Sequence, residues 1–143
     1  MPANPSSFLS LSLTALATAG CALFYTPTLS PGRDTAVLRA GTWGSVYRGG
    51  LVSIVSVSGG TPRWTDTRQM VIPPGERQGE FEVLLCENEQ MQCRPLARVA
   101  VAFHADAGTS YAVRARETVN GSDRFSVWVE NAQTGAIAGH TDP

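Results

Sequence analysis

The chain contains no lysine, so all 11 of its basic residues are arginines. This absence excludes chemistry that depends on a lysine amine: Schiff-base catalysis, phosphate binding by a P-loop, and Ser-Lys catalytic dyads. A large net charge is absent too, because 12 acidic residues nearly balance the arginines and leave a formal net charge of -1. A chain without excess positive charge lacks the electrostatic footprint of a nucleic-acid-binding protein. We therefore expect no nucleic-acid partner.

Specific catalytic motifs are also missing. The sequence has only two histidines, His104 and His140, and no H-E-x-x-H, G-x-S-x-G, Walker or EF-hand pattern. The best triad that can be assembled, Ser110 with His104 and Asp106, has no nucleophile elbow to support its geometry. The sequence thus predicts no catalytic residue, no metal site and no cofactor, and it indicates a protein that is not an enzyme.

The N-terminal segment has the character of a targeting signal. No charged residue precedes Arg33, and residues 8–16 form an apolar run of signal-peptide length. Small residues follow and end at Cys21, in the order Ala-Thr-Ala-Gly-Cys. This order resembles the lipobox of bacterial lipoprotein precursors. The resemblance implies a signal peptide over residues 1–20, a lipid on Cys21, and anchoring in the bacterial cell envelope. Ala22 after the cysteine implies an outer-membrane lipoprotein, which we expect to face the periplasm.

Two other interpretations of this segment stay open. Residues 17–19 also satisfy the A-x-A pattern of an ordinary secretory signal, and residues 8–25 form an apolar stretch at the lower limit for an uncleaved membrane anchor. All three interpretations place the domain outside the cytoplasm. Residues 21–33, rich in Pro, Ser and Thr, are expected to form a flexible tether.

Beyond the tether, the pattern is that of β-structure. Runs rich in Val, Ile, Phe, Tyr and Trp alternate with Gly, Pro, Asn and Asp at regular intervals, and no long helical period competes. We predict an all-β fold, a single antiparallel β-sandwich of immunoglobulin-like or related type with about eight strands, over residues 34–139. Residues 98–104 and 110–116 are expected to form a hairpin, and residues 140–143 a frayed tail. A bulge is expected where Ile54 and Val55 interrupt an alternating strand.

Alternation within the runs predicts which side chains are buried. The expected core consists of Val37, Val52, Ile54, Val57, Val71, Phe81, Val83, Leu85, Val99, Val101, Phe103, Tyr111, Val113, Phe125, Val127 and Val129.

Cysteine usage indicates one disulfide. With Cys21 assigned to the lipid, Cys86 and Cys93 remain as an even pair in an oxidising compartment. Cys86 follows one expected strand and Cys93 precedes the next, so their bond would staple a short acidic loop.

Four side chains are candidate surface contacts: Arg98, Arg114, Arg116 and Trp128. If the strands that carry them are neighbours, the three arginines form a basic stripe that can take phosphates or carboxylates of envelope polymers. The alternative is a solvated face on which these arginines pair with Glu80, Glu82 and Glu117. Trp128 points away from the expected core, either as a contact residue or packed over a neighbouring strand.

A wider resemblance covers most of the mature domain. Residues 72–76, 103–111 and 127–135 carry a Pro-Gly turn, an Ala-Gly turn followed by tyrosine, and a Trp strand ending in Thr-Gly. This pattern is similar to one found in small, uncharacterised lipoproteins of the bacterial cell envelope, and it implies architecture and location only. We expect a lipid-anchored envelope protein with a non-enzymatic binding or structural module, held to the membrane through Cys21 and contacting an envelope protein or polymer. The alternatives are an envelope hydrolase and a periplasmic enzyme inhibitor.

Overall fold

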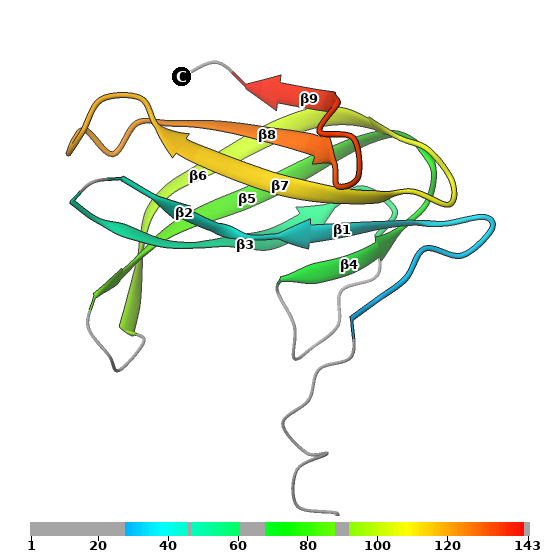
Figure 1. Ribbon diagram of the computed structural model, residues 1–143, viewed down its shortest axis with the longest axis horizontal. Helices are drawn as coiled ribbons and strands as arrows, with labels where there is room; N and C mark the ends of the chain where they lie inside the picture. Colours follow the sequence, from blue (N-terminus) through cyan, green and yellow to red (C-terminus); the bar gives the residue numbers. More distant parts are fainter. Residues whose placement is uncertain (1–27, 46, 61–67, 88–91, 142–143) are drawn as a thin grey trace, which may run out of the picture.

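The computed structural model describes residues 28–45, 47–60, 68–87 and 92–141, which form nine strands and no helix (Figure 1). No helix in this part of the chain is therefore available to cross a membrane. The expected signal peptide, the lipidation site Cys21 and the first half of the tether lie outside the described residues.

The strands form two sheets that pack face to face (Figure 1). The first sheet has five strands in the order β4 (Gln69–Ile72), β1 (Ala36–Ala40), β7 (Ser110–Glu117), β8 (Phe125–Asn131) and β9 (Ile137–Thr141). The second has four, in the order β2 (Thr42–Gly44), β3 (Gly49–Val57), β5 (Gly75–Glu87) and β6 (Gln92–Ala105). The predicted all-β sandwich is confirmed. One pair departs from the expected antiparallel arrangement, because β1 and β7 run parallel.

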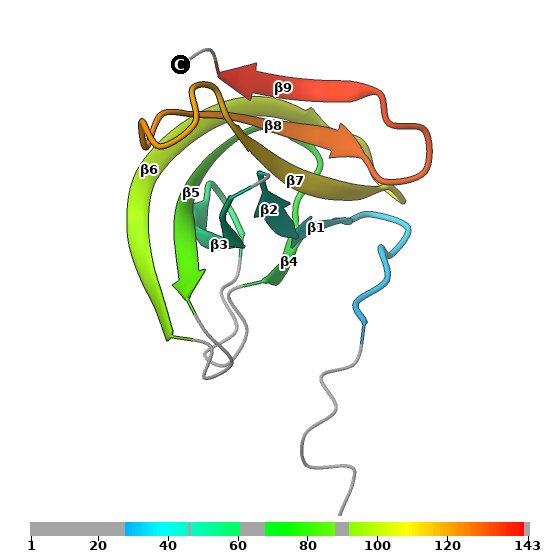
Figure 2. The ribbon, with the colours of Figure 1, turned by 60° about the vertical axis from the view of Figure 1, so that its left-hand side comes forward.

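Short connections carry the chain from one sheet to the other. Gly41 alone separates β1 in the first sheet from β2 in the second (Figure 2). The turn after β6 likewise carries the chain from the second sheet to β7 in the first, so the expected hairpin of these two strands is wrong. A short turn can join strands within a sheet or between sheets, and the alternation of the strands is the same in both cases. Here the Asp106 backbone N–H donates to the Tyr111 hydroxyl at 2.8 Å and holds the turn across the layers.

The core between the sheets follows the predicted alternation. All predicted core residues are buried except Val71 and Val99, which are half-buried. Val71 lies on the outer side of β4, because its neighbours Met70 and Ile72 point inward. Val99 points toward the core, but β6 is an edge strand. The expected bulge is confirmed, since the register of β3 shifts between Ile54 and Ser56.

β1 is buried on both faces. Ala36 and Leu38 join the core, whereas Val37 is fully buried outside that cluster. Part of the expected tether covers the outer side: the Leu29 N–H donates to the Gln69 side chain at 3.0 Å, and the Arg39 guanidinium donates to the Leu29 carbonyl. The end of the tether is thus docked on the sheet rather than free.

The C-terminal strand extends further than expected. β9 continues to Thr141, so His140 and Thr141 belong to the sheet and not to a frayed tail; the tail's last two residues lie outside the described chain. A Cβ on Gly139 would lie 2.1 Å from the Ala102 carbonyl oxygen. Only glycine permits this close approach, by which β9 packs against β6 and closes one edge of the sandwich.

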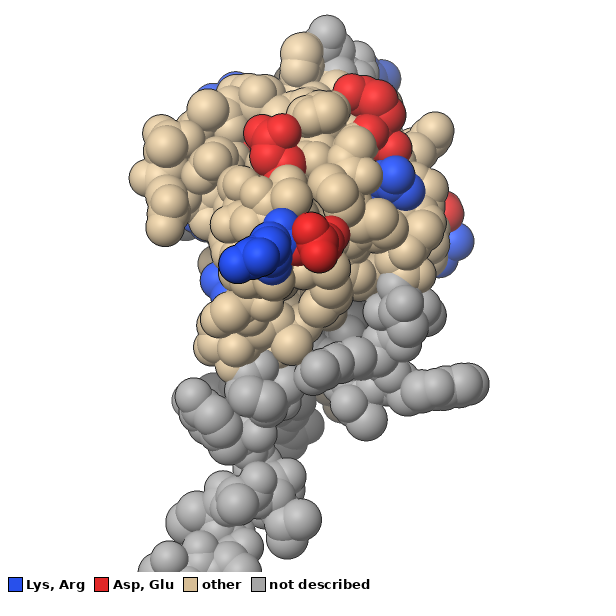
Figure 3. Space-filling model, turned by 90° about the vertical axis from the view of Figure 1, so that its right-hand side faces the viewer, with Lys and Arg blue, Asp and Glu red and all other residues tan. Residues whose placement is uncertain are grey.

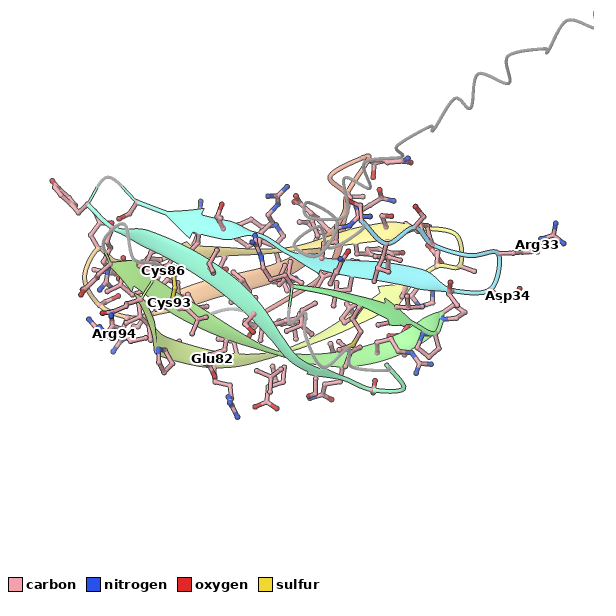
Figure 4. All side chains as sticks on the ribbon, turned by 90° about the horizontal axis from the view of Figure 1, so that it is seen from below. Arg33, Asp34, Glu82, Cys86, Cys93 and Arg94 are labelled. Carbon is pink, nitrogen blue, oxygen red and sulfur yellow. A yellow bond between two sulfur atoms is a disulfide. The ribbon has the colours of Figure 1, made fainter. Side chains whose placement is uncertain are left out.

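A disulfide joins Cys86 of β5 to Cys93 of β6, as predicted (Figure 4). The two residues are directly opposite one another in the antiparallel ladder. Figure 4 shows this bond at one end of the molecule and Arg33 and Asp34 at the other.

An ion cluster lies between the two sheets. The Arg48 guanidinium bonds to the carboxylates of Glu117 and Asp123 and lies 5.9 Å from the centre of the Trp43 ring. The Glu117 side chain is only 1% exposed, and the Asp123 N–H donates to it at 3.2 Å. The hydrogen bond from Arg48 lowers the pKa of Glu117 and outweighs the opposing effect of burial. Since β7 carries Glu117 and Arg48 precedes β3, this cluster ties the two sheets together.

Replacing both bonded cysteines, Cys86→Ser with Cys93→Ser, is expected to lower the free energy of unfolding by about 2 to 3 kcal/mol, because the unfolded chain loses a closed loop. For a domain of this size the melting temperature falls by roughly 10 °C. Thermal unfolding followed by circular dichroism measures the change, with Ser53→Ala on the neighbouring strand as a control. An unchanged melting temperature would contradict a stabilising disulfide.

Glu117→Gln is expected to lower the melting temperature at neutral pH, because a neutral amide replaces the carboxylate that pairs with Arg48. The folded-state pKa of Glu117 lies below its unfolded value, so its ionic contribution is fully present above about pH 4.3 and is lost as the pH falls toward the folded pKa. The difference in melting temperature between wild type and variant should therefore shrink in acid. A difference that stays constant between neutral pH and pH ~3 would refute the assigned role.

Candidate functional site

The outer face of β7, β8 and β9 carries three of the four side chains expected to make surface contacts. Antiparallel pairing places Arg114 directly opposite Trp128, and Trp128 directly opposite His140. Arg116 lies opposite Ser126 in the adjacent row. Side chains at such opposed and diagonal positions are within reach of one another. This surface, which we call the Trp128 face, consists of Arg114, Arg116, Ser126, Trp128, Glu130, Ile137 and His140.

The indole of Trp128 is held in place by Glu130. Its Nε1–H donates to Glu130 Oε2 at 3.0 Å, and the Arg114 Nε–H donates to the other carboxylate oxygen at 2.9 Å. These bonds, the first of them above all, lower the pKa of Glu130 against a smaller opposing effect of burial. The carboxylate is therefore ionised at neutral pH, and it neutralises Arg114 while fixing the half-buried ring.

Arg116 differs from its neighbour. It is exposed, and no hydrogen bond or ion pair joins its side chain to another residue in the part of the chain that the structure describes. A shallow hollow of about 470 Å³ lies beside it, lined by Arg116, Ser126, Trp128, Ile137 and His140. None of these described lining residues is acidic. The hollow thus combines the apolar ring of Trp128 with a guanidinium that no described carboxylate neutralises.

Arg98 does not belong to this surface. It lies on β6 in the other sheet, where its guanidinium is 3.0 Å from Glu82 and 3.5 Å from Glu80. The predicted three-arginine stripe is therefore wrong, because β6 and β7 follow one another in sequence without being neighbours in a sheet. The alternative of a solvated face paired with glutamates is correct for Arg98.

A second group surrounds His104 at the end of β6. Its Nδ1 lies 2.7 Å from Glu76 and its Nε2 3.1 Å from Asp106. These carboxylates, Glu76 first, raise the pKa of His104 against a smaller effect of desolvation. Because both ring nitrogens face carboxylates, neither is positioned to activate Ser110, and the catalytic triad considered from the sequence does not form. A small hollow of about 260 Å³ lies beside this group.

The remaining described surface carries charges of both signs. Figure 3 shows the end of the molecule where β1 begins, with small groups of acidic and basic side chains on a mostly uncharged surface. Within the described ranges no group of His, Cys, Asp or Glu has the arrangement to hold a metal ion.

Four residues of the Trp128 face were missed from the sequence: Ser126, Glu130, Ile137 and His140. Ser126 was available from alternation, because it shares a face of β8 with Trp128. His140 was assigned to a tail, and only its pairing with Trp128 brings it to the hollow. Ile137 is 57% exposed, which local hydropathy does not predict.

The imidazole of His104 is expected to titrate with a midpoint above the ordinary histidine value of about 6.5. The stability it contributes is then fully present below the unfolded pKa and is lost as the pH rises through the folded pKa. Proton NMR of the ring protons measures the midpoint, and Glu76→Gln should bring it back toward the ordinary value. A midpoint at or below about 6.5 in the wild type would contradict the carboxylate contacts.

Comparison with known proteins gave no relative from which a function could be transferred. No protein-family model, no curated protein and no solved structure matches the chain. The site is therefore interpreted from its own geometry.

Proposed function

We propose that this chain is a lipid-anchored protein of the bacterial cell envelope whose β-sandwich binds another envelope component, a protein or a polymer, without catalysing a reaction. The observation that carries the proposal is the hollow of the Trp128 face, where a fixed indole stands beside the guanidinium of Arg116, which has no partner among the described residues. Both residues project from strands, which hold a contact surface more rigidly than loops do.

Glu80 and Glu82, the two acidic residues that share one face of β5, have a common partner. Glu80 and Glu82 lie on one strand and both approach the guanidinium of Arg98. Glycoside hydrolysis requires two carboxyl groups that face each other across the bond to be cleaved. Two carboxylates on the same strand that share one cation do not have this arrangement. These contacts favour binding over hydrolysis.

The position of the tether supports the same proposal. The segment around Leu29 docks on β4 and β1, whereas β8 and β9 lie at the other edge of the five-stranded sheet. The docking of Leu29 therefore leaves the edge of the sheet that carries the Trp128 face uncovered by this described part of the tether. In this proposal the anchor is in the outer membrane and the domain faces the periplasm.

The anchor is tested by the intact mass of protein extracted from membranes, compared with Cys21→Ser. We expect a wild-type mass that corresponds to a chain beginning at Cys21 with a diacylglyceryl group and an N-acyl chain, and no such mass in the variant. An unmodified wild-type chain that begins at Ala22 or earlier would overturn the lipid anchor and favour a secreted or membrane-spanning form.

The binding face is tested by pull-down from solubilised envelopes with the wild type, Arg116→Gln and Arg124→Gln. Arg124 is an exposed arginine in the turn before β8 and serves as the matched control. We expect the wild type and Arg124→Gln to enrich the same component and Arg116→Gln to lose most of it. Equal recovery by all three proteins would overturn the assignment of the Trp128 face.

A further inference from the structure

The hollow of the Trp128 face has the chemistry of a site for a sugar ring. The indole lies on a strand, and its hydrogen bond to Glu130 prevents it from turning away. A fixed aromatic ring offers a flat apolar surface to the C–H groups of a pyranose ring. Ser126, His140 and Arg116 line the same hollow, and Arg116 can donate hydrogen bonds to the hydroxyl groups around the ring.

The charge of the hollow selects for an acidic sugar. Arg114 is neutralised by Glu130, whereas Arg116 keeps an unpaired guanidinium at the hollow, whose described lining includes no acidic side chain. A guanidinium binds a carboxylate through two parallel hydrogen bonds. A neutral sugar offers no anion to this exposed guanidinium, whereas a carboxylated sugar does.

The position of the hollow argues against an extended peptide. Peptides that bind to sheets commonly add a strand at an edge, where backbone groups are free to pair. This hollow lies on the face of β7, β8 and β9, and β7 and β8 are paired on both sides. Recognition here therefore depends on side chains alone. Its volume of about 470 Å³ falls in the range of small-ligand sites.

We propose that the hollow binds a carboxylate-bearing glycan, with one sugar ring stacked on Trp128 and a carboxylate of the chain paired with Arg116. This inference rests on the proposed binding function and names the class of polymer that the domain would hold. The guanidinium supplies charge and orientation, and the indole supplies the apolar contact.

The test uses the purified full chain in detergent and trigalacturonic acid, with galactotriose as the neutral counterpart and a short poly-glutamate peptide as a second anion. Binding is followed by the indole N–H signal of Trp128 in nitrogen-15 NMR, assigned with Trp128→Phe. We expect a saturable shift with trigalacturonic acid and none with the other two compounds. Arg116→Gln should weaken binding by about tenfold or more, the usual effect of losing a charge-assisted hydrogen bond. Arg124→Gln should bind like the wild type, and Arg116→Lys should fall between the wild type and Arg116→Gln.

Several results would overturn the inference. No shift with trigalacturonic acid, equal binding of galactotriose, or undiminished binding by Arg116→Gln would each exclude a carboxylated glycan in this hollow. A shift with poly-glutamate alone would assign the hollow to an acidic peptide instead. If glycan binding fails while Arg116→Gln still loses the component enriched from envelopes, the ligand class is wrong and the proposed function stands. If both experiments fail, the proposed function falls as well.

Discussion

The parallel pairing of β1 with β7 joins the two halves of the chain into one sheet. β1 lies between β4 and β7, and β7 begins the antiparallel meander that continues through β8 and β9. The Gly108 N–H donates to the Thr35 carbonyl, and the Val37 N–H donates to the Thr109 carbonyl, so the turn after β6 is fastened to the start of β1. Without this pairing the meander would have an open edge at β7. The Trp128 face depends on it, because that face exists only where β7, β8 and β9 are held together over the core.

The sequence predicted well what depends on neighbours along a single strand. Alternation places Val52, Phe81 and Val127 in the core, because successive side chains of a strand point to opposite faces wherever that strand lies. The same local information predicted the bulge in β3 and the disulfide, whose two cysteines lie near the end of one strand and near the start of the next.

Pairing between distant strands could not be predicted in this way. β1 and β7 are far apart in sequence, and nothing in either run states that they lie side by side. The turn after β6 has the composition of a hairpin turn, yet it crosses between sheets. The wrong placement of Val71 in the core has a related reason. β4 is short, and Val71 lies between two other apolar residues, Met70 and Ile72. Alternation therefore does not fix which of them point inward, because a shift of one residue exchanges the inner and outer faces of the strand.

The candidate site shows the same division. Arg114, Arg116 and Trp128 were each predicted as candidate surface contacts, because they alternate with core residues, and the antiparallel pairing of β7 with β8 brings them together. Arg98 was added to them because its strand precedes theirs, and sequence order proved a poor guide to which sheet a strand joins. His140 was left out because a strand of five residues near the end of the chain, with a glycine in its middle, has little local signal.

The distribution of carboxylates explains how a nearly neutral chain keeps a local positive charge on the Trp128 face. Glu117 and Asp123 bind Arg48, Glu80 and Glu82 lie against Arg98, and Glu130 binds Arg114. Each arrangement places acidic groups at a specific cation, so the overall balance of charge says little about any one surface. Arg116 stands apart from these arrangements, beside an indole that Glu130 orients. The same carboxylate that neutralises Arg114 thus leaves Arg116 as the charge that an incoming ligand meets, and it keeps the aromatic ring in position to receive that ligand.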